Sequence, residues 1–198
     1  AVIECAASTG LDLVPFDFRN PMKANSYGLG EQIKDALHKG YTNVIVTLGG
    51  SATNDGGIGM LQALGWEFFD KNGSVINPSS GNPLLHINDF SSENQMKELS
   101  NCRITIACDV NNPFFGRDGA AHVFAKQKGA SDEEIQILDQ RLEKFAKLLL
   151  NKKKINVQNI KGAGAAGGLG GALACLHANM ISGIELILTL TNAEEKIK

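Results

Sequence analysis

A β-branched run followed at once by a glycine-rich segment constrains the fold of this chain more than any other feature. Residues 44–48 read Val-Ile-Val-Thr-Leu, and residues 49–57 read Gly-Gly-Ser-Ala-Thr-Asn-Asp-Gly-Gly. An apolar run with no polar face is typical of a strand buried between layers of helices. A helix is expected to begin near Asp55 and to end at Gly65. We therefore predict a strand, a turn and a helix over residues 44–64.

More elements of both kinds follow along the chain. Ser131 and Glu134 form a capping box at the start of the clearest helix, which carries one apolar stripe. Helices are predicted over residues 1–8, 30–39 and 131–150, and further buried strands over residues 103–108 and 184–190. Because strands and helices alternate without a repeat period, we predict an α/β fold with a doubly wound, mostly parallel sheet and helices on both faces.

One region departs from this alternation. Residues 66–69 alternate in polarity before the turn at residues 70–73, which predicts a hairpin with residues 74–76. Residues 77–93 are rich in Asn, Pro, Ser and Gly, and we expect an irregular excursion there. The length of 198 residues fits one main domain. The chain starts at Ala1 without Met and ends in a charged run over residues 193–198. We expect both ends to be cut from a longer protein.

Composition disfavours several classes of function. A net charge of -2 gives no electrostatic reason to expect nucleic acid or membrane as a partner. The apolar runs are too short to span a bilayer, and no secretory leader opens the chain, so we expect a cytoplasmic protein. The histidines are scattered, and the cysteines lack the spacing of zinc ligands. We expect reduced, mostly buried thiols at all four cysteine positions, namely Cys5, Cys102, Cys108 and Cys175.

The glycine-rich segment is the first candidate site. Ligands of open α/β sheets lie beyond the carboxyl ends of the strands, where loops meet helix N-termini. Glycines let the backbone approach a ligand there, and the amides at the helix start can hold a phosphate or a carboxylate. Polar groups come from Ser51, Thr53, Asn54 and Asp55. The alternative is a tight turn in which Asn54 or Asp55 only caps the helix.

A second candidate site follows the strand at residues 103–108. Asp109 stands directly at the end of that strand, where a carboxylate can hold Mg²⁺ or accept a proton from a substrate hydroxyl. Asn111 and Asn112 precede a proline and are equally typical of turn residues. Lys126 and Lys128 offer charge for phosphates, although surface lysines are the commoner explanation.

A third glycine-rich segment matches a dinucleotide fingerprint only formally. Gly162, Gly164 and Gly167 have the required spacing, but residues 155–160 make a poor preceding strand. No Walker motif occurs in the sequence. What remains is a helix start that permits unusually close packing by a ligand or by the sheet.

Together, six segments resemble the type I glycerate kinase family. They are Leu-Val-Pro with Arg-Asn-Pro at residues 13–21, Tyr-Gly-x-Gly-Glu at 27–31, Leu-Gly-Gly-Ser-Ala-Thr-Asn-Asp-Gly-Gly at 48–57, Cys-Asp-Val-x-Asn-Pro at 108–113, Gln-Lys-Gly-Ala at 127–130 and Gly-Ala-Gly-Ala-Ala-Gly-Gly-Leu-Gly at 162–170. Their common order and spacing make chance agreement improbable. The sequence departs from the family at Asn25 and Ser26, where threonines are usual, and at Phe114 and Phe115, where a leucine is usual.

The resemblance implies an ATP-dependent kinase that phosphorylates a hydroxyl of D-glycerate, with ATP and Mg²⁺ as cofactors. It also implies that residues 1–198 are the flavodoxin-like domain of a two-domain enzyme, truncated at both ends. Under this resemblance Asp55 and Asp109 are catalytic, Asp109 holds Mg²⁺, and Arg19 contacts the glycerate carboxylate through a bidentate fork. The remaining substrate- or anion-binding residues would be Gly49, Gly50, Ser51, Thr53, Asn54, Gly56, Gly57, Asn112, Gly164, Gly167 and Gly168.

Two other interpretations stay open. The first is that the chain by itself is a ligand-binding α/β domain, which has no catalytic activity without the missing terminal segments. A flavodoxin-like carrier of flavin or nucleotide is disfavoured, because Trp66 and two tyrosines leave few rings for stacking beside the loops.

Overall fold

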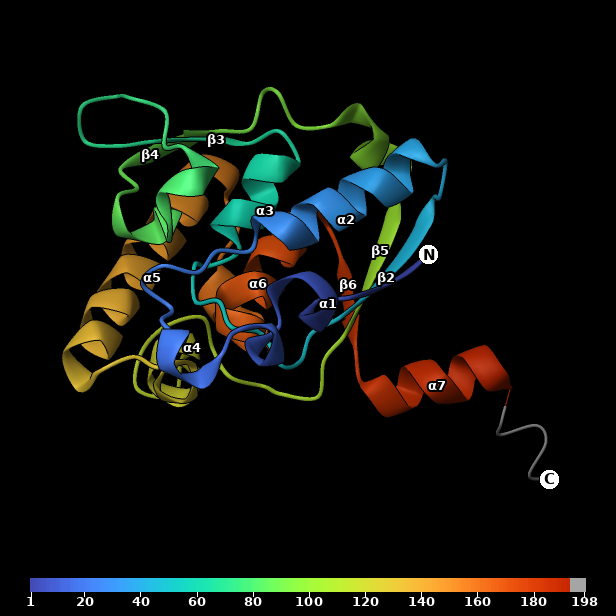
Figure 1. Ribbon diagram of the computed structural model, residues 1–198. Helices are drawn as coiled ribbons and strands as arrows, with labels where there is room; N and C mark the ends of the chain where they lie inside the picture. Colours follow the sequence, from blue (N-terminus) through green and yellow to red (C-terminus); the bar gives the residue numbers. More distant parts are fainter. Residues whose placement is uncertain (193–198) are drawn as a thin grey trace.

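The computed structural model describes residues 1–192, and the charged run at 193–198 lies outside the described residues. Its centre is a parallel sheet of four strands in the order β1-β2-β5-β6 (Figure 1). The strands are β1 (Val2–Glu4), β2 (Asn43–Thr47), β5 (Arg103–Ala107) and β6 (Asn179–Ile181). Beside this sheet, β3 (Glu67–Phe69) pairs antiparallel with β4 (Asp89–Ser91).

Helices connect the strands. The α-helices are α1 (Ala6–Thr9), α2 (Tyr27–His38), α3 (Ile58–Ala63), α4 (Ala120–Phe124), α5 (Asp132–Lys153), α6 (Ala165–Ala174) and α7 (Gly183–Thr191). Short 3-10 turns are η1 (Leu11–Leu13), η2 (Phe16–Phe18), η3 (Pro78–Ser80), η4 (Pro83–Leu85), η5 (Lys97–Asn101), η6 (Lys126–Lys128) and η7 (Val157–Asn159). Within residues 1–192, none of these helices is both long and apolar enough to cross a membrane.

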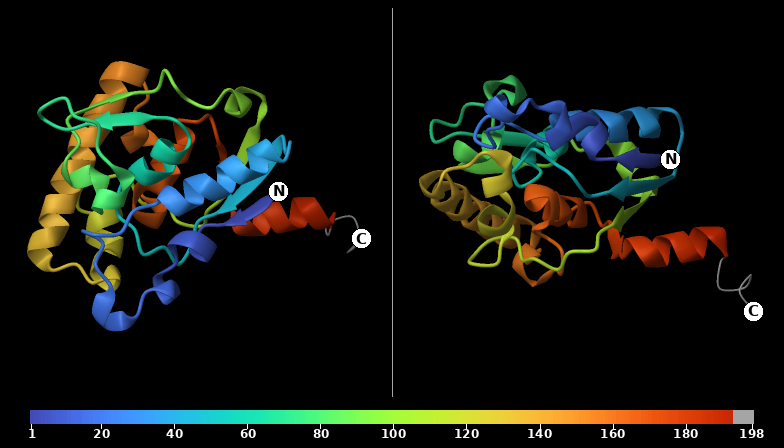
Figure 2. Two further views of the ribbon diagram at one scale, coloured as in Figure 1. Left: turned by 45° about the horizontal axis from the view of Figure 1, so that its top comes forward. Right: turned by 60° about the horizontal axis from the view of Figure 1, so that its bottom comes forward.

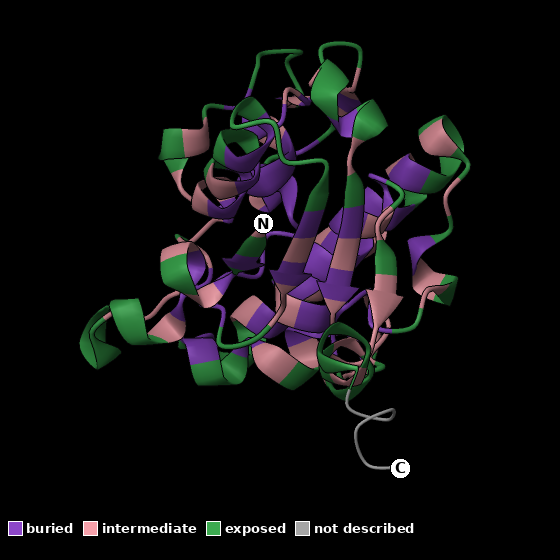
Figure 3. Cartoon of the chain, turned by 90° about the vertical axis from the view of Figure 1, so that its right-hand side faces the viewer, coloured by how far each residue is buried: buried purple, intermediate pink, exposed green. Residues whose placement is uncertain are grey.

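The strands of the sheet follow one another in chain order, and this order decides where the helices lie. Connections between neighbouring parallel strands are right-handed. Because the chain moves across the sheet in one direction, from β1 to β2, β5 and β6, the helices of all three connections lie on the same face. That face carries the fully buried Val44, Val46 and Ile106. Figure 3 looks toward the opposite face, which no described helix covers and where Ile45 is half-buried. Figure 2 shows the strands, the helix α2 and the projecting helix α7 from two further directions.

An aromatic cluster forms the core between the β3–β4 pair and α5. Trp66 stacks on Phe90 with ring centroids 5.2 Å apart, and Phe68 meets Phe145 of α5 edge to face at 5.9 Å. Phe145 also contacts Phe114, whose ring centroid lies 6.1 Å away. Because Phe114 belongs to the segment after β5, this cluster ties the second candidate site to the core.

The main predictions from the sequence are confirmed. The chain is α/β with a parallel sheet, and β2 followed by α3 gives the predicted strand, turn and helix. The helices were expected on both faces of the sheet, but the described helices lie on one face, because all three crossovers run in the same direction. Residues 103–108 contain β5, and α5 begins at a capping box in which Ser131 and Glu134 bond each other's backbone. All four cysteines are free, and three of them are buried.

Two predictions at the ends of the chain are wrong. Residues 184–190 form the helix α7 rather than a strand, and the last strand is the shorter β6. The oxygen of Ser182 accepts a bond from the amide of Glu185, which starts this helix. Residues 1–8 are not one helix, because Ile3 pairs in register with Val46 of β2 and draws residues 2–4 into the sheet.

The region after β3 is more ordered than predicted. Residues 74–76 meet β3 only through a bridge between Phe69 and Val75, whereas β4 supplies the extended pairing. An irregular excursion was predicted for residues 77–93, but this segment contains η3, η4 and β4. Leu84 and Ile87 in this segment are fully buried, so hydrophobic packing orders it despite its turn-forming composition.

Candidate active site

Two of the three predicted site loops begin side by side at the carboxyl edge of the sheet. β2 and β5 are neighbours, and the amide of Leu48 donates to the carbonyl oxygen of Ala107 at 3.2 Å. Residues 49–57 and residues 109–116 leave the sheet directly after this bond. The structure thus brings together two segments that are far apart in sequence, at the edge where parallel α/β folds bind ligands.

The third loop, residues 162–168, is bonded to both of the others. The amide of Gly164 donates to the carbonyl oxygen of Asn112 at 3.0 Å, and the amide of Gly56 donates to that of Gly167 at 3.0 Å. Gly164, Gly167 and Gly168 are themselves buried, so they supply packing rather than an exposed ligand surface.

Gly167 shows why this third loop is rich in glycine. Its φ of +73° lies in the left-handed region, and a Cβ atom there would lie 2.1 Å from the carbonyl oxygen of Thr53. The neighbouring residues 166 and 168 also have positive φ. Only glycine allows the loops at residues 49–57 and 162–168 to touch at this point.

Asp55 is fully buried beneath the first loop. Its Oδ2 accepts bonds from the amide and hydroxyl of Ser26, both at 2.8 Å, and from the amide of Gly59 at 3.0 Å. Its Oδ1 accepts from the amide of Gly57 at 3.0 Å. Burial raises the pKa of Asp55, and these four hydrogen bonds oppose that rise.

These bonds change the expected position of a ligand. The amides of Gly57 and Gly59 at the start of α3 already donate to Asp55, and that of Met60 donates to the hydroxyl of Ser26. The helix start is therefore satisfied internally, as the alternative of a capping Asp55 requires, and its amides are not free to hold an anion in this structure. Besides Asp55, the buried polar residues of this loop are Ser51, Thr53 and Asn54.

The accessible part of the first loop is its beginning. Gly49 and Gly50 are exposed, and within the described residues neither amide donates to a protein acceptor. Gly50 has a φ of +61°, and a Cβ atom built on Gly49 would meet nothing within 4 Å. Two exposed residues at the end of β2 thus carry amides without a described protein acceptor, which is an arrangement suited to an anion.

Lys128 lies under this accessible part, and the expectation that it is a surface lysine is wrong. Its side chain is buried, and its Nζ donates to the Ser51 hydroxyl at 3.0 Å and to the Thr53 carbonyl oxygen at 2.6 Å. Burial lowers the pKa of Lys128 to about 8, although nearby Cys5 and Asp55 act in the opposite direction. Lys126 is a surface lysine, as expected, and pairs with Asp132.

Other contacts hold the first loop from the side of the segment at residues 77–93. The side-chain amide of Asn82 donates to the carbonyl oxygens of Pro21 at 2.8 Å and of Asn54 at 3.1 Å. Among the described residues, the side-chain oxygen of Thr53 and both polar side-chain atoms of Asn54 have no hydrogen-bond partner. No sequence pattern indicates that Asn82 supports the loop, because its neighbours are typical of turns.

Asp109 is exposed at the end of β5. Its Oδ1 accepts a bond from the amide of Gly183 at the start of α7, at 2.8 Å, and its Oδ2 accepts no bond from the described part of the chain. No group of three His, Cys, Asp or Glu side chains placed to hold a metal occurs within residues 1–192. Asp109 is thus a single accessible carboxylate, and it also fixes the start of α7.

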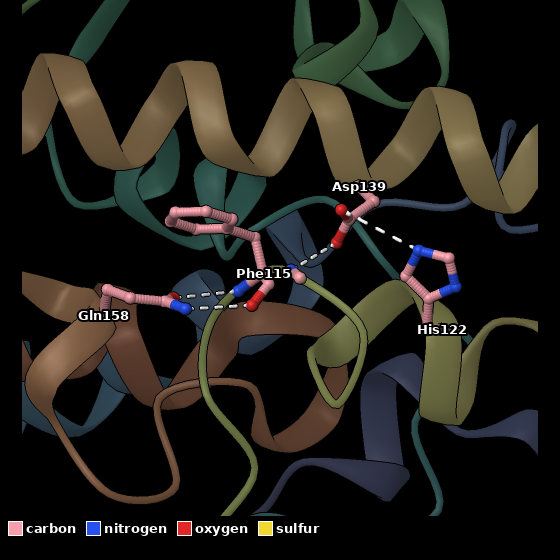
Figure 4. A network of polar contacts seen from close by, with 5 residues as sticks. Phe115, His122, Asp139 and Gln158 are labelled. Atoms are coloured by element: carbon pink, nitrogen blue, oxygen red, sulfur yellow. Dashed lines mark hydrogen bonds and ion pairs between the residues drawn. The ribbon is translucent and has the colours of Figure 1, made fainter.

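The rest of the second loop is anchored to α5 and η7 (Figure 4). Asp139 of α5 accepts a bond from the amide of Gly116 at 2.8 Å, and its second oxygen lies 3.8 Å from Nε2 of His122. Gln158 bonds both the amide and the carbonyl of Phe115, at 3.1 and 3.0 Å. Asn112 donates to the backbone of Asp118 at 2.9 Å. The loop is therefore held at both ends.

Arg19 lies on a segment that packs against η6. A Cβ atom on Gly129, whose φ is +95°, would lie 2.1 Å from the Arg19 carbonyl oxygen. The guanidinium group bonds the Val14 carbonyl at 3.3 Å and lies 3.6 Å from the carboxylate of Asp12. In this structure the Arg19 side chain thus contacts residues 12–14 of its own segment.

A separate cavity of about 420 Å³ lies between the segment after β3 and α5. Its basic lining residues are Lys71, His86, Arg141 and Lys144, and none of its lining residues belongs to the three loops. The candidate site is therefore defined by free polar groups at the sheet edge rather than by this cavity.

Comparison with known proteins gives one consistent result. Residues 1–198 match the glycerate kinase family over their whole length. The chain is 46% identical over 198 residues to a protein named glycerate 2-kinase from Escherichia coli strain K12. It is 43% identical over 199 residues to a glycerate kinase from Halalkalibacterium halodurans. In both comparisons the match covers all of this chain and 52% of the relative.

A solved structure agrees with these relatives. The crystal structure described as glycerate kinase 2 of Salmonella typhimurium LT2 superposes with a TM-score of 0.91 at 43% identity. The match covers 95% of this chain and 50% of that one. The chain thus spans about half the length of the proteins it matches.

Proposed function

The chain belongs to the glycerate kinase family, and we propose that it forms part of an ATP-dependent kinase that phosphorylates a hydroxyl of D-glycerate. One observation carries the proposal beyond the family relationship. The free amides of Gly49 and Gly50 and the exposed carboxylate of Asp109 follow neighbouring strands at the same edge of the sheet. The site therefore offers anion-binding donors next to a carboxylate.

This combination suits phosphoryl transfer. Such a reaction requires the reacting groups to be positioned and their negative charge to be stabilised, with little covalent chemistry from the protein. Backbone amides at Gly49 and Gly50 would hold a carboxylate or phosphate oxygen without adding a counter-charge. The carboxylate of Asp109 would accept a hydrogen bond from the substrate hydroxyl or hold a metal ion.

The residues also fit ATP with Mg²⁺ as cofactor. Mg²⁺ prefers oxygen ligands and is commonly held by one or two carboxylates together with phosphate oxygens and water. Asp109 has one carboxylate oxygen free of described protein partners, which meets that requirement. When bound, Mg²⁺-ATP supplies the phosphoryl group and neutralises part of its charge.

The other site residues divide into two groups under this proposal. Arg19 and Asn112 are half-buried and would lie at the rim of the site, where Arg19 would contact the glycerate carboxylate after leaving its own loop. The buried groups would position the loops instead of touching substrate; they are Asp55, Ser51, Thr53, Asn54, Gly56, Gly57, Gly164, Gly167 and Gly168.

We further propose that residues 1–198 are one domain of a two-domain enzyme, because the matched relatives are about twice as long. The partner of this domain would then be the second domain. The rival proposal is a domain that binds glycerate or phosphate but turns nothing over by itself, and the uncovered face of the sheet favours it for the isolated chain.

One assay tests these proposals together. The chain and a full-length protein that carries it are incubated separately with Mg-ATP and D-glycerate, and ADP formation is measured. We expect turnover by the full-length protein and much less by residues 1–198. Equal turnover would contradict the two-domain proposal. A full-length protein that is folded but makes no glycerate-dependent ADP would contradict the proposed activity.

A further inference from the structure

Lys128 is the buried cation of the candidate site, and the reaction outlined above does not use it. It is one of the largest fully buried side chains of the described residues. An ammonium group seldom occurs in such a place, because removing its charge from water is costly unless partners compensate. It donates hydrogen bonds to the Ser51 hydroxyl and the Thr53 carbonyl oxygen, at 3.0 and 2.6 Å.

Both partners belong to the segment that directly follows the exposed amides. Ser51 comes after Gly50, and Thr53 lies two residues further on. The carbonyl oxygen of Thr53 accepts the hydrogen bond from Nζ of Lys128. A Cβ atom built on Gly167 would lie 2.1 Å from the same oxygen. Lys128 thus fixes the loop at residues 49–57 from below while the loop at residues 162–168 packs against it.

The same turn also contacts the segment that carries Arg19. Gly129 packs against the backbone of Arg19 so closely that a side chain would clash with its carbonyl oxygen. The turn formed by η6 and Gly129 therefore contacts both the loop at residues 49–57 and the segment that carries Arg19. The titratable groups whose charge acts on Lys128 are Cys5 and Asp55.

We propose that Lys128 is a positioning residue of the kinase reaction, whose buried ammonium holds Ser51 and Thr53 so that the amides of Gly49 and Gly50 face the bound anion. The inference rests on the proposed function for its effect on catalysis. Its geometric part concerns the loop alone and can be measured without any turnover.

The catalytic test compares Lys128→Met with Lys126→Met in the full-length protein. Methionine keeps much of the length of the side chain but removes its charge and donors, and Lys126 is an exposed neighbour on the same η6 turn. We expect Lys128→Met to lower kcat/KM at least about tenfold while Lys126→Met stays within about twofold. The wild-type rate should also fall above about pH 8 as Lys128 loses its proton, and Lys128→Met should lack that fall.

A second measurement does not depend on activity or on the variant being stable. The amide of Ala52 donates to Thr9 and that of Gly56 to Gly167, so both report on the closed loop in hydrogen exchange. The closed loop binds the Lys128 proton less tightly than an opened loop would, so in wild-type residues 1–198 raising the pH from 8 to 10 should slow the exchange of both amides relative to the intrinsic rate, by at most about tenfold per pH unit. Lys128→Met should exchange both amides faster than the wild type at neutral pH and should lack this pH dependence.

The outcomes separate the two proposals. If the wild type makes no phosphoglycerate but the Ala52 and Gly56 amides respond as stated, the proposed function fails and the geometric role of Lys128 stands. If kcat/KM of Lys128→Met stays within about twofold of the wild type, or both lysine variants lose activity alike, the positioning role is overturned. Unchanged exchange at Ala52 and Gly56 would overturn it as well.

Discussion

The ammonium nitrogen of Lys128 lies 2.6 Å from the carbonyl oxygen of Thr53, although the two residues are 75 positions apart in the chain. This bond links the turn after α4 to the loop after β2, and it is buried. It is one of several contacts that give this glycine-rich loop a defined shape, together with the bond from the Leu11 amide to the carbonyl oxygen of Gly50 at 2.6 Å. The free amides of Gly49 and Gly50 depend on that shape for their direction.

The burial of Lys128 predicts how stability depends on pH. Burial lowers the pKa of Lys128 from an ordinary 10.5 to about 8. Between these values the unfolded chain binds more protons than the folded chain, so the free energy of unfolding rises with pH, by at most about 1.4 kcal/mol per unit. Urea unfolding of wild type and Lys128→Met across this range checks the prediction. Parallel pH profiles for the two proteins would refute it.

Asp109→Asn should remove activity and leave the fold intact. Because the side chain is exposed and accepts one bond from Gly183, its replacement should cost about 1 kcal/mol or less of stability. Loss of the carboxylate should lower kcat/KM of the full-length protein about 100-fold. Asp118→Asn is the matched control, since Asp118 is exposed two residues beyond the same loop. An Asp109→Asn protein with full kinase activity would contradict the role proposed for this carboxylate.

Asp55→Asn, in contrast to Asp109→Asn, should lower the stability of the fold. Four donors converge on the carboxylate, and an asparagine would turn an NH₂ group toward some of them in a buried place. We expect a loss of about 2 to 4 kcal/mol in the free energy of unfolding, measured with urea. A loss below about 0.5 kcal/mol would show that the Ser26 and α3 amides do not depend on this group.

Gly167→Ala tests the close approach of two loops. Alanine at a positive φ costs about 1 to 2 kcal/mol by itself, and here its Cβ would also clash with the Thr53 carbonyl oxygen. Gly73→Ala is the control, because Gly73 has a φ of +78° and a Cβ atom there would meet nothing within 4 Å. Gly167→Ala should unfold at a lower urea concentration than Gly73→Ala, and equal midpoints would rule out the clash.

Local patterns predicted the elements whose own sequence decides their structure. The capping box at Ser131 marks α5 correctly, and the β-branched run gives β2. The same kind of signal was available for α7, since Ser182 and Glu185 have capping-box spacing, but the apolar run after them favoured a strand. Residues 2–4 carry no such signal, because only pairing with β2 makes them a strand.

The candidate site was predictable in its position and less so in its roles. The strand-end rule placed residues 49–57 and Asp109 at one edge of the sheet, as the structure has them. It could not show which polar groups face inward, because that depends on Ser26, Asn82 and Lys128, which reach the loop from distant segments. A charged residue with no local signal, such as Lys128, is assigned to the surface by default.

The central claim is that the exposed beginning of the loop at residues 49–57 binds the anionic group in a glycerate kinase. Gly49→Asp tests it most directly, since a Cβ atom at Gly49 would meet nothing within 4 Å, and the variant should fold without strain. A negative charge there should repel the ligand by about 1 to 4 kcal/mol. In the full-length protein, kcat/KM for D-glycerate or for Mg-ATP should fall at least about tenfold, while the neutral Gly49→Asn protein loses much less. A folded Gly49→Asp protein with wild-type kcat/KM for both substrates would contradict the claim.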